Sequence, residues 1–253
     1  MKIAIVTGAS SGMGRDFVLY ISKLCPTLDE IWVVARRRER LENLQSHVHT
    51  KLRILEYDLT DDAAINEIKE LLYKEQPSVK YLVNAAGYGK IGNFKEISYE
   101  ENVGMIDLNC RALTGLTFVC LPYLKNKSKI INMASSAGFM PQPRFCVYAA
   151  SKAYVLSFSR ALAHELKDRH ISVTAVCPGP VKTEFFDIAE QTGEVKFIKT
   201  VVMAGPKEVV KQALRDSMRN KEKSVYGVAI KAFEVLAKVA PHKLIMNITD
   251  RLS

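Results

Sequence analysis

Short apolar runs alternate with helical repeats along the first part of the chain. Runs of mainly apolar residues predict buried strands at residues 3–6, 30–35, 52–56 and 79–83. Apolar residues at helical spacing predict a helix through residues 17–24 and two more at 38–46 and 61–74. Strands that alternate with helices require right-handed crossovers, which place parallel strands between two helical layers. We therefore predict an α/β fold of the Rossmann type, a doubly wound parallel sheet of about seven strands.

The rest of the chain continues this pattern without a linker or a repeat. It predicts a strand ending at "KIINMAS", a helix over "YAASKAYVLSFSRALAHEL", a helix beginning at Pro206 and a last strand at "KSVYG". We expect a single domain over residues 1–253, with residues 1–135 mainly for dinucleotide binding and 136–228 for catalysis and substrate. Residues 229–253 form a helical extension. It would roof the substrate site, join a dimer or rest on a membrane surface.

Composition and charge exclude several classes of function. The 253 residues carry a formal charge of +9, but the cations outside residues 36–40 are mixed with acids, so we predict no nucleic-acid partner. Five scattered cysteines without a C-x-x-C pair predict reduced thiols and a cytoplasmic location. The histidines show no metal-ligand spacing, and no apolar run is long enough for an export signal or a transmembrane helix, so we expect none of these.

A glycine-rich segment follows the first strand and opens the first helix. The pattern is Thr7-Gly8-x-x-x-Gly12-x-Gly14. Glycines let the backbone approach a pyrophosphate closely, and the free N–H groups at a helix start favour negative charge. We therefore predict a dinucleotide cradle made of Gly8, Ser10, Ser11, Gly12, Met13 and Gly14.

Polar or small residues end the other predicted strands and should share one edge of the sheet. The predicted cofactor contacts there are Arg36, Arg37, Asp58, Leu59, Asn84, Ala85 and Gly87. Asp58 would hydrogen-bond the amine of adenine; the alternative is a helix N-cap. An NAD site usually has an acid at the end of the second strand, whereas this chain has Ala35 followed by Arg36. A guanidinium grips a 2′-phosphate, so we predict NADP(H), with Arg37 as a helper near adenine. Arg38 and Arg40 should begin a solvated helix.

A tyrosine and a lysine four residues apart suggest acid–base chemistry. Tyr148 and Lys152 share one face of the predicted helix. A tyrosine must lose roughly 3 pKa units, or about 4 kcal/mol, to act as a base near neutral pH. An ammonium at about 4 Å supplies on the order of 4 kcal/mol at an effective dielectric near 20. Ser135 ends the preceding strand, and its hydroxyl should meet the phenol at the same edge.

The chain resembles the short-chain dehydrogenase/reductase family from residue 1 to about residue 205. The matching motifs are "TGASSGMG", "YDLT", "NAAG", "LNC", "MASSAG", "YAASK" and "CPGPVKT". The resemblance implies that Ser135 orients the substrate oxygen, Tyr148 transfers the proton, and Lys152 binds the nicotinamide ribose and lowers the pKa of the tyrosine. It also implies that Asn109 holds a relay water. It places four residues near the nicotinamide: Pro178, Gly179, Val181 and Thr183. A homodimer or homotetramer through the helices near residues 100–125 and 148–168 is expected on the same ground.

The substrate site should be walled by residues 138–147 and 184–205. Their apolar side chains predict an apolar small-molecule ketone or alcohol, and hydroxysteroid dehydrogenases are among the relatives that the tail suggests. The predicted substrate contacts are Ser135, Phe139, Phe145, Tyr148, Phe185 and Phe186; Met140, Ile188, Phe197, Val201 and Met203 belong to the same apolar set. Arg144, Lys196 and Lys199 would meet an anionic tail or remain solvated loop cations. The alternatives are a β-ketoacyl reductase and a non-catalytic protein that binds NADP.

Overall fold

Seven parallel strands form the centre of the protein. The computed structural model describes residues 1–191, 203–243 and 245–246. The sheet has the order β3-β2-β1-β4-β5-β6-β7, and every pair of neighbouring strands is parallel. The strands are β1 (Lys2–Thr7), β2 (Glu30–Ala35), β3 (Lys51–Glu56), β4 (Ser78–Asn84), β5 (Leu124–Met133), β6 (Ser172–Val176) and β7 (Lys223–Ser224). The strand order reverses between β1 and β4, which is where a doubly wound sheet opens a crevice.

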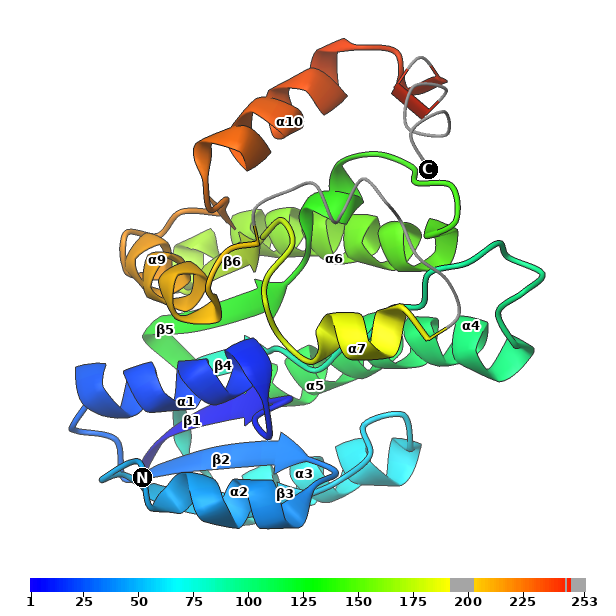
Figure 1. The fold of residues 1–253 in the computed structure, drawn as a ribbon. Coiled ribbons are helices and arrows are strands. Elements are labelled where there is room, and N and C mark those ends of the chain that lie inside the picture. Colours follow the sequence, from blue (N-terminus) through cyan, green and yellow to red (C-terminus); the bar gives the residue numbers. More distant parts are fainter. Residues whose placement is uncertain (192–202, 244, 247–253) are drawn as a thin grey trace.

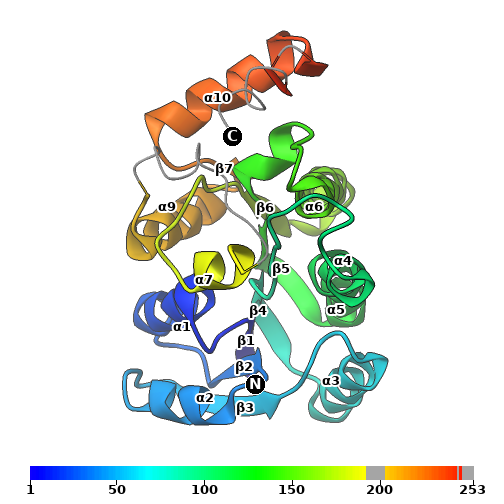
Figure 2. The ribbon, with the colours of Figure 1, turned by 45° about the vertical axis from the view of Figure 1, so that its right-hand side comes forward.

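Helices cover both faces of this sheet, as Figure 2 shows. The α-helices of the described residues are α1 (Gly12–Leu24), α2 (Arg38–Gln45), α3 (Asp62–Glu75), α4 (Tyr99–Ile106), α5 (Leu113–Cys120), α6 (Cys146–Glu165), α7 (Phe185–Ala189), α9 (Pro206–Met218) and α10 (Val228–Val239). A π-helix, Asp107–Ala112, joins α4 to α5. The sequence-based prediction of a Rossmann-type sheet is confirmed.

Alternation along the strands divides the core between the two faces. Ala4 and Val6 pack with α1, α2 and α9, whereas Ile3 and Ile5 pack with α3, α5 and α6. Because successive strand side chains point to opposite faces, a strand buried on both sides is apolar throughout. This is why the short run at residues 3–6 is continuous rather than alternating.

The predicted bounds differ from the observed ones mainly at caps. The helix predicted over 61–74 is α3, and Asp61 is its N-cap, accepting a hydrogen bond from the Ala63 N–H. The strand predicted at 223–227 is shorter, because β7 ends at Ser224 and the chain turns at Gly227 with a φ of 89°. These shifts leave the strand ends that face the crevice in place.

One helical run, Tyr99–Tyr123, is long and apolar enough to cross a membrane by length and composition among the described residues. Leu116 and Cys120 of this run pack with Ile130 of β5, in the core on the face of the sheet that α3 and α6 also cover. We therefore interpret it as a core helix.

Helix α10 lies apart from the two layers, above α6 and the turn at residues 136–139 (Figure 1). Its inner side packs on that turn through Phe233 and Ala237, next to Met140 and Ile245. Helix α10 thus lies over one end of the crevice, which is the first of the three places that the sequence left open for the extension. A dimer contact or a membrane contact of this segment stays a prediction.

Candidate active site

A cavity of about 1240 Å³ runs along the carboxyl ends of the strands. It is larger than the roughly 300–1,000 Å³ of a typical small-molecule pocket. It begins at the glycine-rich loop and the end of β2, passes the end of β4, and reaches Ser135, Tyr148 and α10. Nearly all predicted site residues line it; Asn84, Asn109 and Phe139 do not.

The glycine-rich loop leaves no room for side chains at two positions. A Cβ on Gly8, which has a φ of 65°, would lie 2.9 Å from the Ala85 carbonyl carbon, and a Cβ on Gly14 would lie 2.3 Å from the Gly8 oxygen. Ser11, the N-cap of α1, makes no side-chain cap hydrogen bond. The backbone therefore forms a bare cradle at a helix start, which fits the pyrophosphate of a dinucleotide.

Thr7 ties this loop to the end of β4. Its hydroxyl accepts hydrogen bonds from the Ala85 and Ala86 N–H groups, both at 3.0 Å, and donates to the Val83 oxygen. Thr7 stands directly before Gly8 in the glycine-rich pattern, but its hydrogen bonds to the chain after β4 could not be predicted from that pattern. This bridge fixes the two strand ends between which a nucleotide would lie.

Arg36 directly follows β2, with its side chain 74% exposed. The Arg36 Nη1 lies 3.5 Å from the Asp58 Oδ2. The Asp58 Oδ1 accepts hydrogen bonds from the Thr60 N–H and hydroxyl. Burial raises the pKa of Asp58, but the Thr60 hydrogen bonds and the Arg36 charge outweigh it, so the pKa lies below its ordinary value. The helix N-cap interpretation of Asp58 is wrong, because Asp61 caps α3.

Arg37 and Arg40 share a carboxylate partner that the sequence did not indicate. The Arg37 guanidinium donates to the Ser10 and Ser11 hydroxyls and to Glu184, and Arg40 donates to the same carboxylate. Arg40 is therefore not simply a solvated helix cation. The sequence could not indicate this, because Glu184 lies 144 residues from Arg40 and 147 from Arg37.

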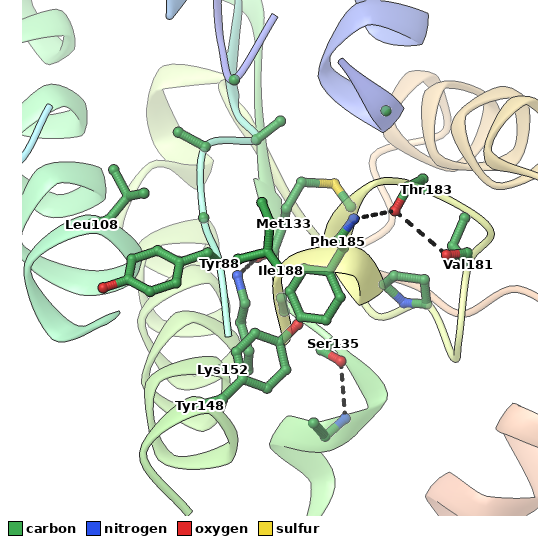
Figure 3. A pocket seen from close by; sticks show the side chains of 18 of the residues that line it. Tyr88, Leu108, Met133, Ser135, Tyr148, Lys152, Val181, Thr183, Phe185 and Ile188 are labelled. Carbon is green, nitrogen blue, oxygen red and sulfur yellow. Dashed lines mark hydrogen bonds between the residues drawn. The ribbon is translucent and has the colours of Figure 1, made fainter. Parts of the chain in front are cut away.

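Tyr148 and Lys152 project from α6 into the middle of the cavity, Tyr148 toward Ser135 and Lys152 toward Met133 (Figure 3). The Tyr148 ring stacks on Phe145 at 4.3 Å between centroids and meets Phe185 at 5.3 Å, which leaves Tyr148 only 7% exposed. The Lys152 Nζ lies 5.6 Å from the Tyr148 ring centroid and donates to the Met133 oxygen at 2.8 Å.

The pKa of Tyr148 differs from the predicted one. Burial raises it to about 12, against a smaller opposing effect of the hydrogen bond with Ser135. Burial also lowers the pKa of Lys152 to about 8. In the free protein, burial therefore outweighs any lowering of the Tyr148 pKa by Lys152, whose ammonium donates to the Met133 oxygen. The phenol is thus protonated at neutral pH and can act as a proton donor.

Asn109 lies in the π-helix and is 1% exposed. Its amide nitrogen donates to the Tyr88 oxygen and the Ser151 hydroxyl, and its amide oxygen accepts from the Tyr88 N–H. A Cβ on Gly87 would lie 2.7 Å from that amide oxygen. Asn109 therefore joins the chain after β4 to α6.

Asn84 and Phe139 have structural contacts outside the cavity. The Asn84 amide donates to the Thr117 hydroxyl and to Asn132, which in turn donates to the Ser159 hydroxyl. This buried polar chain crosses from β4 and α5 through β5 to α6. Phe139 packs against Phe233 of α10, at 6.2 Å between ring centroids.

The substrate end of the cavity is apolar on one side. Three predicted phenylalanines line it: Phe145, Phe185 and Phe186. Residues that were not predicted also line it, four from α10 and one after that helix: Ala229, Ile230, Phe233, Leu236 and Ile245. Pro178, Gly179, Val181 and Thr183 line the cavity between the two ends. Arg144 lies beside this end rather than in its lining. The predicted residues Lys196, Phe197, Lys199 and Val201 lie outside the described residues.

Among the described residues, Lys90 is buried as well as Lys152. Its ammonium lines the cavity, pairs with Glu101 at 2.8 Å and donates to Gln191 at 2.7 Å. No pattern in the sequence singled it out. Its contacts join the chain after β4 to α4 and to the segment after α7.

Comparison with known proteins gives a consistent picture. A family model described as short chain dehydrogenase matches residues 2–193. A 3-ketodihydrosphingosine reductase from Bacteroides thetaiotaomicron is 34% identical, with 76% of this chain and 70% of the relative covered. An NADP-dependent 3-hydroxy acid dehydrogenase from Escherichia coli is 34% identical, with 78% and 80% covered. The structure of a Sphingobium yanoikuyae short-chain dehydrogenase in complex with NADPH has a TM-score of 0.81 and 26% identity, with 97% and 95% covered.

Proposed function

The chain belongs to the short-chain dehydrogenase/reductase family, and on that premise we propose that it is an NADP(H)-dependent enzyme that interconverts an apolar ketone or aldehyde and its alcohol. The observation that carries the proposal is the continuity of one cavity. It joins the glycine-rich loop and Arg36 at one end to Ser135, Tyr148 and Lys152 at the other. Ser135 and Tyr148 would then lie at the reactive end of a dinucleotide held along this cavity.

Cofactor choice follows from the end of β2. The exposed Arg36 guanidinium offers a phosphate ligand where an NAD site would carry an acid, and the E. coli relative is named as NADP-dependent. Gly8, Gly12 and Gly14 would hold the pyrophosphate, and Lys152 the ribose next to the nicotinamide. When bound, NADP(H) supplies or accepts the hydride.

The protein groups supply orientation and a proton. The hydroxyls of Ser135 and Tyr148 hold the carbonyl oxygen, which fixes the carbonyl carbon in the cavity. With a pKa raised to about 12, Tyr148 is protonated at neutral pH and gives its proton to the oxygen as charge develops there. The free protein therefore holds the phenol in the protonated form that reduction of a carbonyl requires. Asn109 acts as a positioning residue through Tyr88 and Ser151.

The substrate is apolar, because the cavity beyond Ser135 and Tyr148 is lined by hydrophobic side chains. The cavity is lined at this end by Phe233 of α10, by Ile245 after that helix and by Met140. An alkyl chain or a fused ring system would bury its surface against them. Long-chain 3-ketones come first for testing, because one relative is named as a 3-ketodihydrosphingosine reductase. Ketosteroids and β-ketoacyl thioesters are the other candidates.

A substrate panel tests this function. Purified protein is mixed with NADPH or NADH and with a long-chain 3-ketone, a ketosteroid, a β-ketoacyl thioester and a small aryl ketone, and the absorbance at the reduced-nicotinamide band is followed. We expect turnover with NADPH and at least one apolar ketone. NADPH binding without turnover of any carbonyl would favour the alternative of a non-catalytic NADP-binding protein, and a preference for NADH would refute the cofactor assignment.

Other parts of the sequence-based account stay predictions. They are the single domain over residues 1–253, the homodimer or homotetramer, the cytoplasmic location and the absence of a nucleic-acid partner. Gel filtration with light scattering measures the oligomeric state.

A further inference from the structure

Glu184 lies between two arginines at the nucleotide end of the cavity. Its Oε2 accepts from the Arg37 Nη1 at 2.9 Å, and its Oε1 accepts from the Arg40 Nη1 at 2.5 Å. Hydrogen bonds from both arginines hold the pKa of Glu184 below its ordinary value, so the carboxylate is charged at neutral pH. The arginine pair is thus an anion site that already holds an anion from the protein itself.

This anion site lies against the glycine-rich loop. Arg37 also donates to the hydroxyls of Ser10 and Ser11 at 2.8–3.2 Å. A Cβ on Gly12 would lie 3.4 Å from the Thr183 Cγ2, so the segment that carries Glu184 touches the loop directly. Arg36, Arg37 and Glu184 line the cavity, while Arg40 holds the other Glu184 oxygen from outside the lining. A phosphate that enters beside Arg36 therefore meets the Arg37 guanidinium already paired with Glu184.

The residue after Glu184 covers the proposed proton donor. The Phe185 ring lies next to the Tyr148 ring, tilted by 51° at 5.3 Å between centroids (Figure 3). The Phe145 ring stacks on the same tyrosine. At its far end α7 is held by the Ile91 N–H, which donates to the Ala189 oxygen at 2.9 Å, and by Lys90, which donates to Gln191. Residues 184–191 thus form a strap across the cavity, fixed by ion pairs at the nucleotide end.

We propose that Glu184 competes with the 2′-phosphate of NADP(H) for Arg37 and Arg40, and that its displacement frees α7 from Tyr148. The proposal rests on the proposed function. A phosphate monoester carries about −1.5 to −2 charge at pH 7 and three acceptor oxygens, so it replaces a single carboxylate on two guanidinium groups. NADH has no 2′-phosphate and leaves Glu184 in place. Glu184 is therefore a selectivity residue that links the phosphorylated cofactor to access at Tyr148.

Calorimetric titration of the full chain tests the competition. The variant Glu184→Gln keeps the side-chain shape and removes the charge. We expect NADPH to bind about fivefold to tenfold more tightly than to the unaltered protein, because two half-exposed ion pairs no longer oppose it, with NADH affinity unchanged within about twofold. The matched control is Glu42→Gln. It removes an exposed ion pair with Arg38 on α2, the helix that also carries Arg40, and neither Glu42 nor Arg38 lines the cavity. It should change neither affinity.

The outcomes separate the inference from the function. A weaker or unchanged NADPH affinity in Glu184→Gln, or an equal gain for NADH, refutes the competition while NADPH binding and turnover by the unaltered protein keep the proposed function. No NADPH binding by either protein refutes the proposed function itself.

Hydrogen exchange tests the release of α7 without turnover. Adenosine 2′,5′-bisphosphate is the probe, and AMP without the 2′-phosphate is its control. We expect the probe to speed exchange at the α7 amides of the unaltered protein by about threefold or more, while AMP does not. Glu184→Gln should show the faster exchange without any ligand. Slower or unchanged exchange on adding the bisphosphate would overturn the link between Glu184 and α7.

Discussion

The buried Lys152 ammonium should lower the free energy of unfolding of the protein. Burial lowers its pKa from the ordinary 10.5 to about 8, which corresponds to about 3 kcal/mol of unfavourable burial of the ammonium. Because the folded-state pKa is the lower one, the penalty is present in full below about pH 8 and disappears as pH rises toward 10.5. Lys152→Met removes it, at a cost of roughly 1 kcal/mol for the unpaired Met133 oxygen.

Urea unfolding followed by circular dichroism from pH 7 to pH 10 measures this balance. At pH 7 we expect Lys152→Met to be more stable by about 2 kcal/mol, and the difference to shrink and change sign as pH approaches 10. The control is Lys69→Met on the exposed face of α3, which should change stability by less than about 0.5 kcal/mol at every pH. A Lys152→Met variant less stable at pH 7, or a difference that does not vary with pH, would refute the assignment of a buried, strained ammonium.

Three further predictions concern the two ends of the cavity. Arg36→Ala should weaken NADPH binding by about tenfold and leave NADH binding unchanged, as measured by calorimetry, because a charge-assisted phosphate contact is lost; equal losses would contradict it. Gly14→Ala should abolish binding of both dinucleotides and lower Tm, since its Cβ would lie 2.3 Å from the Gly8 oxygen; a variant with normal affinity and Tm would argue against the cradle. Phe233→Ala should raise the KM for an apolar ketone about tenfold with NADPH affinity unchanged, because apolar surface beside Met140 is removed; an unaltered KM would place the substrate elsewhere.

The period of the hydrophobic pattern was sufficient to predict the fold. Strands buried on both faces and helices with one apolar stripe give different repeats, and the glycines after the first strand indicate where a helix start approaches a neighbouring strand. The spacing of Tyr148 and Lys152 likewise places them on one helix face, and the motif order brings Ser135 to the same sheet edge. These features depend on local sequence, and the structure contains all of them.

Features that depend on contacts between distant residues were not predicted. The pairing of Glu184 with Arg37 and Arg40 joins residues almost 150 positions apart, and nothing near either partner signals it. The pKa of Tyr148 also depends on two phenylalanine rings from separate segments, whereas the sequence indicated only Lys152. Asn84 is a related case, because its amide lies in a buried polar chain although the motif suggested a cofactor contact.

Single-turnover reduction by Tyr148→Phe tests the central claim most directly. The variant keeps the aromatic ring between Phe145 and Phe185 and removes only the hydroxyl, so NADPH affinity measured by calorimetry should stay within about twofold. We predict that the rate of ketone reduction falls by about 10²–10⁴-fold, the usual contribution of a positioned general acid. A variant that binds NADPH and reduces the ketone at the unaltered rate would contradict the account.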